Sequence, residues 1–162
     1  MDRAGKAIAQ WRKERPDLDV SPMAVLGRLS EAATLVARDG LAPLFARYGL
    51  QHGEFDVLAT LRRSGPPFSL TPTALYEATM VTSGAMTNRL DRLEKAGLIH
   101  RVPHPSDRRG LMVQLSEKGR DLIDRAVEAH VENEHRILSG LDVGERERLA
   151  ALLEKLIAGL AG

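Results

Sequence analysis

Cysteine is absent from the 162 residues of the chain. This absence excludes disulfides, thiolate metal sites and sensors that work by thiol oxidation. Aromatic residues make up only 4% of the sequence, so a core must be built from Leu, Val, Ile, Ala and Met. The hydrophobic fraction of 43% is sufficient for such a core. We therefore expect one compact domain, or one domain with helical extensions.

Long apolar runs are also missing. None approaches the roughly 20 residues that a membrane span requires, and residues 1–10 lack the apolar centre of a signal peptide. We expect a cytoplasmic protein with no membrane partner. The sequence has no phosphate-binding loop, no nucleophile elbow and no pair of catalytic carboxylates, so we expect no enzyme. The histidines lack metal-ligand spacing, and neither a metal nor a cofactor is expected.

A strong net charge of one sign is absent as well, since the formal charge is +1. The local balance differs: residues 88–110 contain six Lys or Arg and three acidic residues. Binding of phosphates depends on local positive charge, which the sum over the whole chain does not report. Charge alone leaves two interpretations open, a nucleic-acid interface and a solvated surface of mixed charge.

The most informative stretch runs from residue 82 to residue 99. The hydroxyl groups of Thr82 and Ser83 can accept hydrogen bonds from the free amides at a helix start. Gly97 is the residue type that best tolerates the left-handed turn after a helix. We therefore predict a helix between these signals.

This predicted helix has two faces. An apolar stripe at helical spacing is formed by Met86, Leu90 and Leu93. At about 100° per residue, a polar face lies roughly opposite and contains Asn88, Arg92 and Lys95. Arg89 falls about 60° from the centre of the stripe, so we expect it to point partly inward. A helix that is anchored on one side and carries Asn and Arg on the other suits a DNA major groove.

Periodicity and turn residues organise the rest of the chain around this helix. Further helices are predicted at about 1–15, 21–49, 52–63, 72–80, 116–138 and 142–160. Gly40 and Pro43 should bend or break the second of them. Alternation with a period of two predicts strands at Ile99–Pro103 and Leu111–Leu115, joined by a polar loop.

The resulting fold class is mainly α with a small β-hairpin wing. It is a winged helix-turn-helix with N- and C-terminal dimerisation helices. We divide it into N-terminal helices (1–48), a DNA-binding domain (49–116) and C-terminal helices (117–162). A small winged domain cannot cover all the apolar faces of the flanking helices, which favours a two-fold homodimer. The alternative is a bundle formed within one chain.

The order of elements resembles the MarR family of bacterial transcription regulators over essentially the whole chain. Asp107-Arg108-Arg109-Gly110, followed by an alternating strand, is similar to the wing signature of that family. Residues 11–23, 54–63 and 82–89 resemble its urate-responsive branch. The resemblance implies a homodimer that binds a pseudo-palindromic operator in double-stranded DNA and represses a neighbouring gene.

The predicted recognition helix would enter the major groove, and the wing arginines would reach the adjacent minor groove. Asp107 is expected to orient one of these arginines. The alternative for the wing is a solvated hairpin tip. The residues expected to bind DNA are Ser83, Thr87, Asn88, Arg92, Lys95, Arg108 and Arg109.

The resemblance also assigns four residues to a urate site, namely Trp11, Asp56, Arg89 and Arg101. Asp56 stands in a helix that is apolar on nearly every side, and a buried charge needs a partner. Arg89 is suited to that role. We predict that urate recruits Arg89, displaces Asp56 and shifts the recognition helix, which links ligand and DNA affinity.

Several alternatives remain open. The pair of Asp56 and Arg89 could be purely structural, with Trp11 merely fixing the N-terminal helix. The effector could be another small anion or a phenolic compound. The winged domain could also bind proteins instead of DNA.

Overall fold

The computed structural model of the chain describes residues 1–79 and 86–161. These residues form two compact units, Met1–Leu41 and Ala42–Gly162. The first contains α1 (Arg3–Glu14), α2 (Ser21–Leu35) and a π-helical segment, η1 (Val36–Leu41). The second contains six helices and three short strands among its described residues. This mainly helical fold with a small sheet confirms the predicted fold class.

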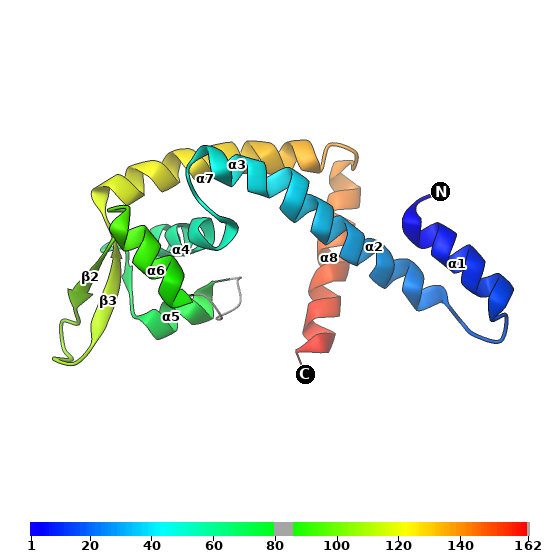
Figure 1. The fold of residues 1–162 in the computed structure, drawn as a ribbon, viewed down its shortest axis with the longest axis horizontal. Helices are drawn as coiled ribbons and strands as arrows, with labels where there is room; N and C mark the ends of the chain where they lie inside the picture. Colours follow the sequence, from blue (N-terminus) through cyan, green and yellow to red (C-terminus); the bar gives the residue numbers. More distant parts are fainter. Residues whose placement is uncertain (80–85, 162) are drawn as a thin grey trace. The chain divides into compact units, whose positions relative to one another are not determined.

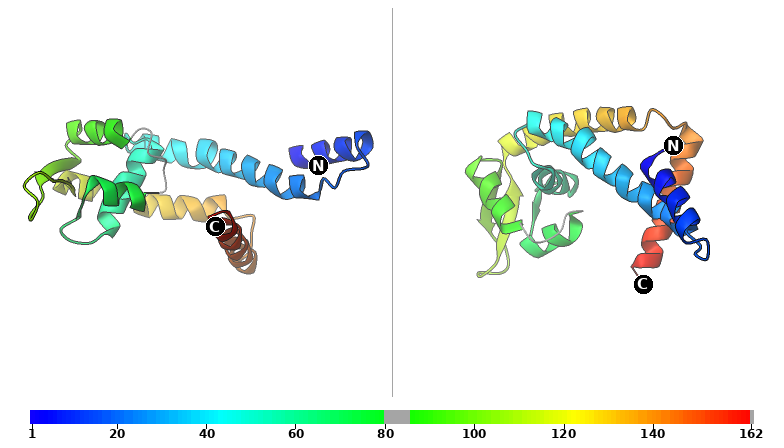
Figure 2. Two further views of the ribbon diagram at one scale, coloured as in Figure 1. Left: turned by 90° about the horizontal axis from the view of Figure 1, so that it is seen from below. Right: turned by 45° about the vertical axis from the view of Figure 1, so that its right-hand side comes forward.

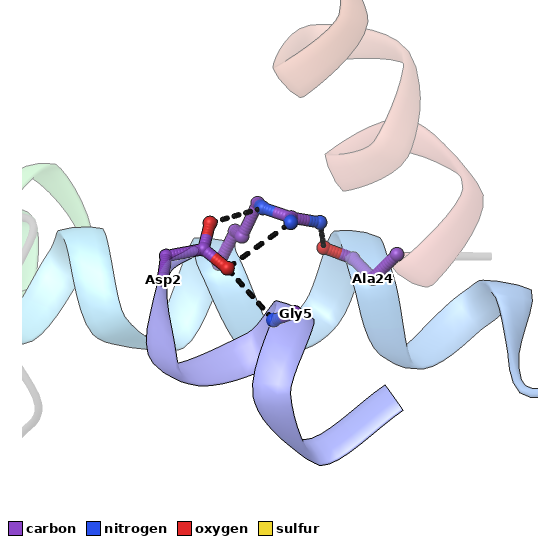
Figure 3. Close-up of polar contacts among 4 residues, drawn as sticks. Asp2, Gly5 and Ala24 are labelled. Carbon is purple, nitrogen blue, oxygen red and sulfur yellow. Dashed lines mark hydrogen bonds and ion pairs between the residues drawn. The ribbon is translucent and has the colours of Figure 1, made fainter. Parts of the chain in front are cut away.

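In the first unit, α1 lies along the first half of α2 (Figure 2). Asp2 joins the two helices, because its Oδ1 atom accepts a hydrogen bond from the amide of Gly5 at 2.7 Å and its Oδ2 atom accepts from Arg28 Nε at 2.7 Å (Figure 3). The helices approach closely: a Cβ atom at Gly27 would lie 3.3 Å from that of Ala4. Asp2 therefore caps α1 and fastens it to α2.

The second helix changes its winding near the predicted position but is not interrupted, since residues 21–47 are helical throughout. Regular α-helix ends at Leu35, and the backbone then follows the wider η1 segment through Gly40. A new helix, α3 (Ala42–Arg47), begins one residue before Pro43. Proline cannot donate the backbone hydrogen bond that a helix interior requires, and the wider winding of η1 directly precedes Pro43.

The second unit is built around α4 (His52–Arg63), which contacts α3, α5 (Pro72–Ala78), α6 (Met86–Lys95) and α7 (Glu117–Ile137). Val57, Leu58 and Leu61 of α4 are completely buried. A capping box starts the helix, since Glu54 Oε2 accepts a hydrogen bond from the amide of Gln51 at 2.8 Å. The first turn of α4 is therefore held by side chains as well as by backbone bonds.

The apolar stripe of α6 is confirmed, because Met86, Leu90 and Leu93 are all buried. After the helix, Gly97 adopts a φ of 74°, the left-handed turn that its position predicts. The start predicted at Thr82 and Ser83 lies outside the described residues.

Both predicted strands are confirmed with their bounds. β2 (Ile99–Pro103) pairs antiparallel with β3 (Leu111–Leu115), with Ile99 opposite Leu115, and forms the wing beside α6 (Figure 1). A third strand, β1 (Ser69–Leu70), pairs with the other edge of β3. It was not predicted, because two residues are too few to show alternation.

The turn from the wing into α7 is tightly bonded to the end of α6. Ser116 caps α7 by accepting from the amide of Gly119 at 2.9 Å, and its hydroxyl donates to the carbonyl of Gly97 at 2.7 Å. The amide of Ser116 also donates to the carbonyl of Leu98 at 3.0 Å. A Cβ atom at Gly119 would collide with that same carbonyl oxygen. Only glycine fits there.

The last helix, α8 (Val143–Leu160), starts with a capping box, in which Asp142 Oδ1 accepts from the amide of Glu145 at 2.8 Å. No residue of α8 is buried, and the same is true of α2. Within the described part of the chain, no helix is both long and apolar enough to cross a membrane.

Replacing Gly119 with Ala should lower the free energy of unfolding by about 1–3 kcal/mol, because the new methyl group has no space beside Leu98. Urea denaturation followed by circular dichroism measures the change. Gly159→Ala is the matched control, since no atom lies within 4 Å of its Cβ position. This control should be neutral or slightly stabilising. Equal effects of the two substitutions would contradict the close approach.

The contact between α1 and α2 should depend on pH. The hydrogen bond from Arg28, followed by that from Gly5, lowers the pKa of Asp2 below its ordinary value of 3.8. A lowered carboxyl pKa stabilises the folded state above the unfolded value, and this contribution is lost as the pH falls through the folded value. The fluorescence of Trp11, the single tryptophan, should therefore report a transition of α1 below pH 3.8.

Asp2→Asn keeps an oxygen that can cap Gly5 but loses the charge. At neutral pH the variant should already show the Trp11 fluorescence that the wild type shows only in acid, when α1 loosens from α2. It should also lack the acid transition assigned to Asp2. A transition that is the same in both proteins would assign it to another carboxyl group.

Candidate DNA interface and ligand site

The exposed face of α6 carries the side chains that the sequence predicts for DNA recognition. Thr87, Asn88, Arg92 and Lys95 are all exposed, whereas Arg89 is half-buried, as its angular position predicts. Ser83 lies outside the described residues. The face therefore offers an amide, a hydroxyl group and two cations on one rigid helix.

Arg92 is anchored to the neighbouring helix. Its Nε atom lies 3.0 Å from Glu54 Oε1 at the start of α4. Glu54 is only 3% exposed, whereas Arg92 is 56% exposed. The carboxylate is thus inside the protein and the guanidinium group extends from it to the surface.

Arg89 lies against the same turn of α4. A Cβ atom at Gly53 would come within 2.6 Å of the central guanidinium carbon of Arg89, so a larger residue there would displace the Arg89 side chain from this position. Gln51, Asn88 and Arg92 surround Arg89 in a surface hollow of about 520 Å³. The two arginines of α6 therefore both extend to the first turn of α4.

Asp56 follows Gly53 by three residues, which places the two side-chain positions about 5–6 Å apart on one face of α4. Asp56 is half-buried and lines a pocket of about 720 Å³ between α4 and α7. Other charges line this pocket too: Arg62 donates to Asp124 at 2.6 Å, and Glu128 lies nearby. The structure thus brings Arg89 and Asp56 to consecutive turns of α4.

Arg101 holds the wing to the recognition helix. From β2 it donates to Asp91 Oδ1 at 2.6 Å and also pairs with Glu94, both on α6. The hydrogen bond to Asp91, reinforced by Glu94 and opposed by partial burial, raises the pKa of Arg101. Any ligand that uses Arg101 must compete with two carboxylates.

The wing loop is shaped by two polar side chains. His104 Nδ1 accepts from the amides of Ser106 at 3.2 Å and Asp107 at 3.1 Å. Asp107 Oδ1 accepts from the backbone amide of Arg109 at 2.9 Å. Asp107 therefore fixes the turn that carries the wing arginines, and the side chains of Arg108 and Arg109 are exposed.

Trp11 is the fourth residue of the predicted ligand site and belongs to the first unit. It is 44% exposed on α1 and lines a surface hollow with Gln10, Lys13 and Glu14. Its ligand role therefore rests on the resemblance alone. Among the residues that the structure describes, no group of three His, Cys, Asp or Glu could hold a metal ion.

Comparison with known proteins agrees with this arrangement. The sequence pattern of the MarR family matches residues 48–110, which include α4, α6, β2 and the wing loop. The chain is 48% identical to the HTH-type transcriptional regulator PecS of Dickeya dadantii over 149 residues, 92% of this chain and 89% of PecS. It is 33% identical to the multiple antibiotic resistance protein MarR of Salmonella typhimurium, over 64% of this chain and 71% of that protein.

The fold is similar to solved structures of the same kind. A MarR family transcriptional regulator from Streptomyces coelicolor, in complex with DNA, superposes with a TM-score of 0.79. The two chains are 26% identical, and the match covers 90% of this chain and 91% of the other.

The chain belongs to the MarR family. It is therefore a DNA-binding transcriptional regulator with a winged helix-turn-helix. Members of this family are non-enzymatic, which agrees with the expectation from the sequence. Among the interpretations left open above, a winged domain that does not bind DNA is thereby excluded.

In this MarR-family regulator, sequence reasoning missed three acidic residues that hold the arginines in place: Glu54, Asp91 and Glu94. One local signal pointed to Glu54, since glutamate three residues after Gln51 fits a capping box. No local signal indicates that Arg92 is its partner, because 38 residues separate the two.

Arg101→Ala should lower the free energy of unfolding by about 1 kcal/mol and weaken DNA binding without any ligand. The reason is that Asp91 and Glu94 would then face each other without their shared cation. Chemical denaturation and a DNA titration measure the two effects. Arg108→Ala, on the exposed wing loop, should change stability by less than about 0.5 kcal/mol. An Arg101 variant with unchanged stability and DNA affinity would leave this residue only its predicted ligand role.

Proposed function

We propose that this regulator is a repressor that binds a pseudo-palindromic operator as a homodimer. A small anionic aromatic ligand releases it, and urate is the best candidate. One observation carries the proposal: Arg89, on the recognition helix, packs against Gly53, one turn before Asp56 on α4. A single cation is thus common to the helix that contacts DNA and to the face of α4 that carries Asp56.

Exposed apolar side chains support the homodimer. Neither α8 nor α2 buries a residue within one chain, although both carry several Leu residues. Large exposed side chains include Leu152, Ile157 and Leu160 of α8 and Val25 and Leu26 of α2. A two-fold partner would cover such faces and would set two recognition helices about one turn of DNA apart.

The proposed release begins at Arg89. Guanidinium groups bind planar anions through paired hydrogen bonds, so urate would attract Arg89. Urate would also attract Arg101, provided that one of the two carboxylates paired with Arg101 gave way to the ligand. Asp56 would be repelled by the anion. Because Arg89 is fixed in α6, its movement would change the orientation of the recognition helix. A coupling of about 1–3 kcal/mol between ligand and DNA is ordinary for such a link.

A phenolic effector is the second candidate, and the acidic residues of the pocket favour it. Asp56, Asp124 and Glu128 line the pocket between α4 and α7, where Arg62 donates a hydrogen bond to Asp124. Neighbouring carboxylates disfavour a fully ionised ligand more than a neutral phenol.

A mobility-shift assay on the promoter region beside the regulator's own gene tests the proposal. The chain should bind that duplex tightly, with a steep dependence on salt, and millimolar urate should release it. Arg89→Ala should reduce both the DNA affinity and the response to urate, whereas Arg89→Lys should retain part of the affinity. Release by phenols but not by urate would favour the second candidate. An unchanged urate response in Arg89→Ala would refute the shared-residue mechanism.

A further inference from the structure

Arg92 differs from the other exposed cations of the DNA-binding surface because a buried carboxylate fixes it. In the part of the chain that the structure describes, Lys95, Arg108 and Arg109 have no ion pair, whereas Arg92 Nε lies 3.0 Å from Glu54 Oε1. This contact connects an exposed side chain of the recognition helix to a residue that is 3% exposed.

The carboxylate itself cannot turn. Glu54 Oε2 accepts from the amide of Gln51 at 2.8 Å, while Oε1 faces Arg92. Both oxygens are therefore engaged, and the group sits in the first turn of α4, where the helix dipole stabilises negative charge. An ion pair with a carboxylate held in this way restricts where the guanidinium group of Arg92 can lie.

The contact uses the Nε side of Arg92 and leaves its two terminal nitrogens for a partner. Asn88 precedes Arg92 by four residues, so the two side chains are neighbours on the exposed face of α6. Both border the hollow of about 520 Å³ that also contains Gln51. The two terminal nitrogens of a guanidinium group match the O6 and N7 acceptors of guanine in the major groove.

We propose that Arg92 recognises a guanine in each half-site through its terminal nitrogens and that Glu54 is the positioning residue for this contact. The proposal rests on the proposed function, because it requires α6 in the major groove of a preferred sequence. Fixing the guanidinium group in the free protein reduces the rotamer freedom lost on binding.

The ion pair between Arg92 and Glu54 suits a contact from Arg92 to a base better than a contact to a phosphate. Phosphate binding uses net positive charge, and the charge of Glu54 offsets that of Arg92. The hydrogen-bond donors of Arg92 are unaffected by this offset. An arginine with directed donors and little net charge contributes sequence preference with little electrostatic affinity.

The test starts with the full-length protein and a pool of random-sequence duplexes, from which the preferred sequence is selected. Each guanine of that sequence is then replaced in turn by 7-deazaguanine, which lacks the N7 acceptor, and the Kd is measured at fixed salt. The wild type should lose affinity at one guanine per half-site. Arg92→Ala should abolish that loss and reduce the preference for this guanine by about 5- to 150-fold.

Glu54→Gln tests the positioning role. Glutamine retains the capping box, so the helix start is preserved. The variant should lose much of the guanine preference while its affinity for an unrelated duplex stays equal or rises, because a negative charge has been removed. Its unfolding curve, compared with the wild type, shows whether the fold is intact. If the Glu54→Gln variant is not folded, the Arg92→Ala variant decides the proposal.

Lys95→Ala is the matched control on the same helix. It should weaken binding to all duplexes equally and lower the slope of log K against log salt by about one. The inference is overturned if Arg92→Ala behaves like Lys95→Ala, or if a folded Glu54→Gln keeps the full preference. A wild-type protein that selects no sequence overturns the proposed function itself, which is a different result.

Discussion

The attachment of α6 to the first turn of α4 is the contact on which the DNA-binding surface depends. Arg89 packs against Gly53, and Arg92 bonds to the buried carboxylate of Glu54. Buried leucines hold the opposite side of α6, but apolar contacts are non-directional and allow a helix to slide or rotate slightly. The two arginines add polar contacts on the α4 side of α6, and these restrict how α6 can rotate against α4.

A second set of charges holds the other end of the recognition helix. Arg101 bonds to Asp91 and Glu94, which connects α6 to the wing. The acidic residues of this region therefore neutralise specific arginines instead of facing DNA alone. This explains how a chain with a formal charge of +1 presents a basic surface, since Lys95, Arg108 and Arg109 have no ion pair among the described residues.

Local sequence signals predicted the elements but not these contacts. The stripe of α6, the strands of the wing and the helix starts near Ser116 and Asp142 were all predicted, because each depends on neighbouring residues. The inward lean of Arg89 also followed from helical geometry. The pairing of Arg92 with Glu54 and the space that Gly53 provides depend on packing between distant segments. Sequence periodicity carries no information about such packing.

The junction at Gly119 has a mechanical consequence. Ser116 bonds to the carbonyls of Gly97 and Leu98, and the backbone of Gly119 presses directly on Leu98, so the end of α6 and the start of α7 form one rigid joint. The 21 residues of α7 form a lever arm of about 31 Å at 1.5 Å per residue. A rotation of about 5° at this joint would displace the far end of α7 by about 3 Å. A small angular change at the joint would therefore produce a displacement of a few ångströms at the far end of α7.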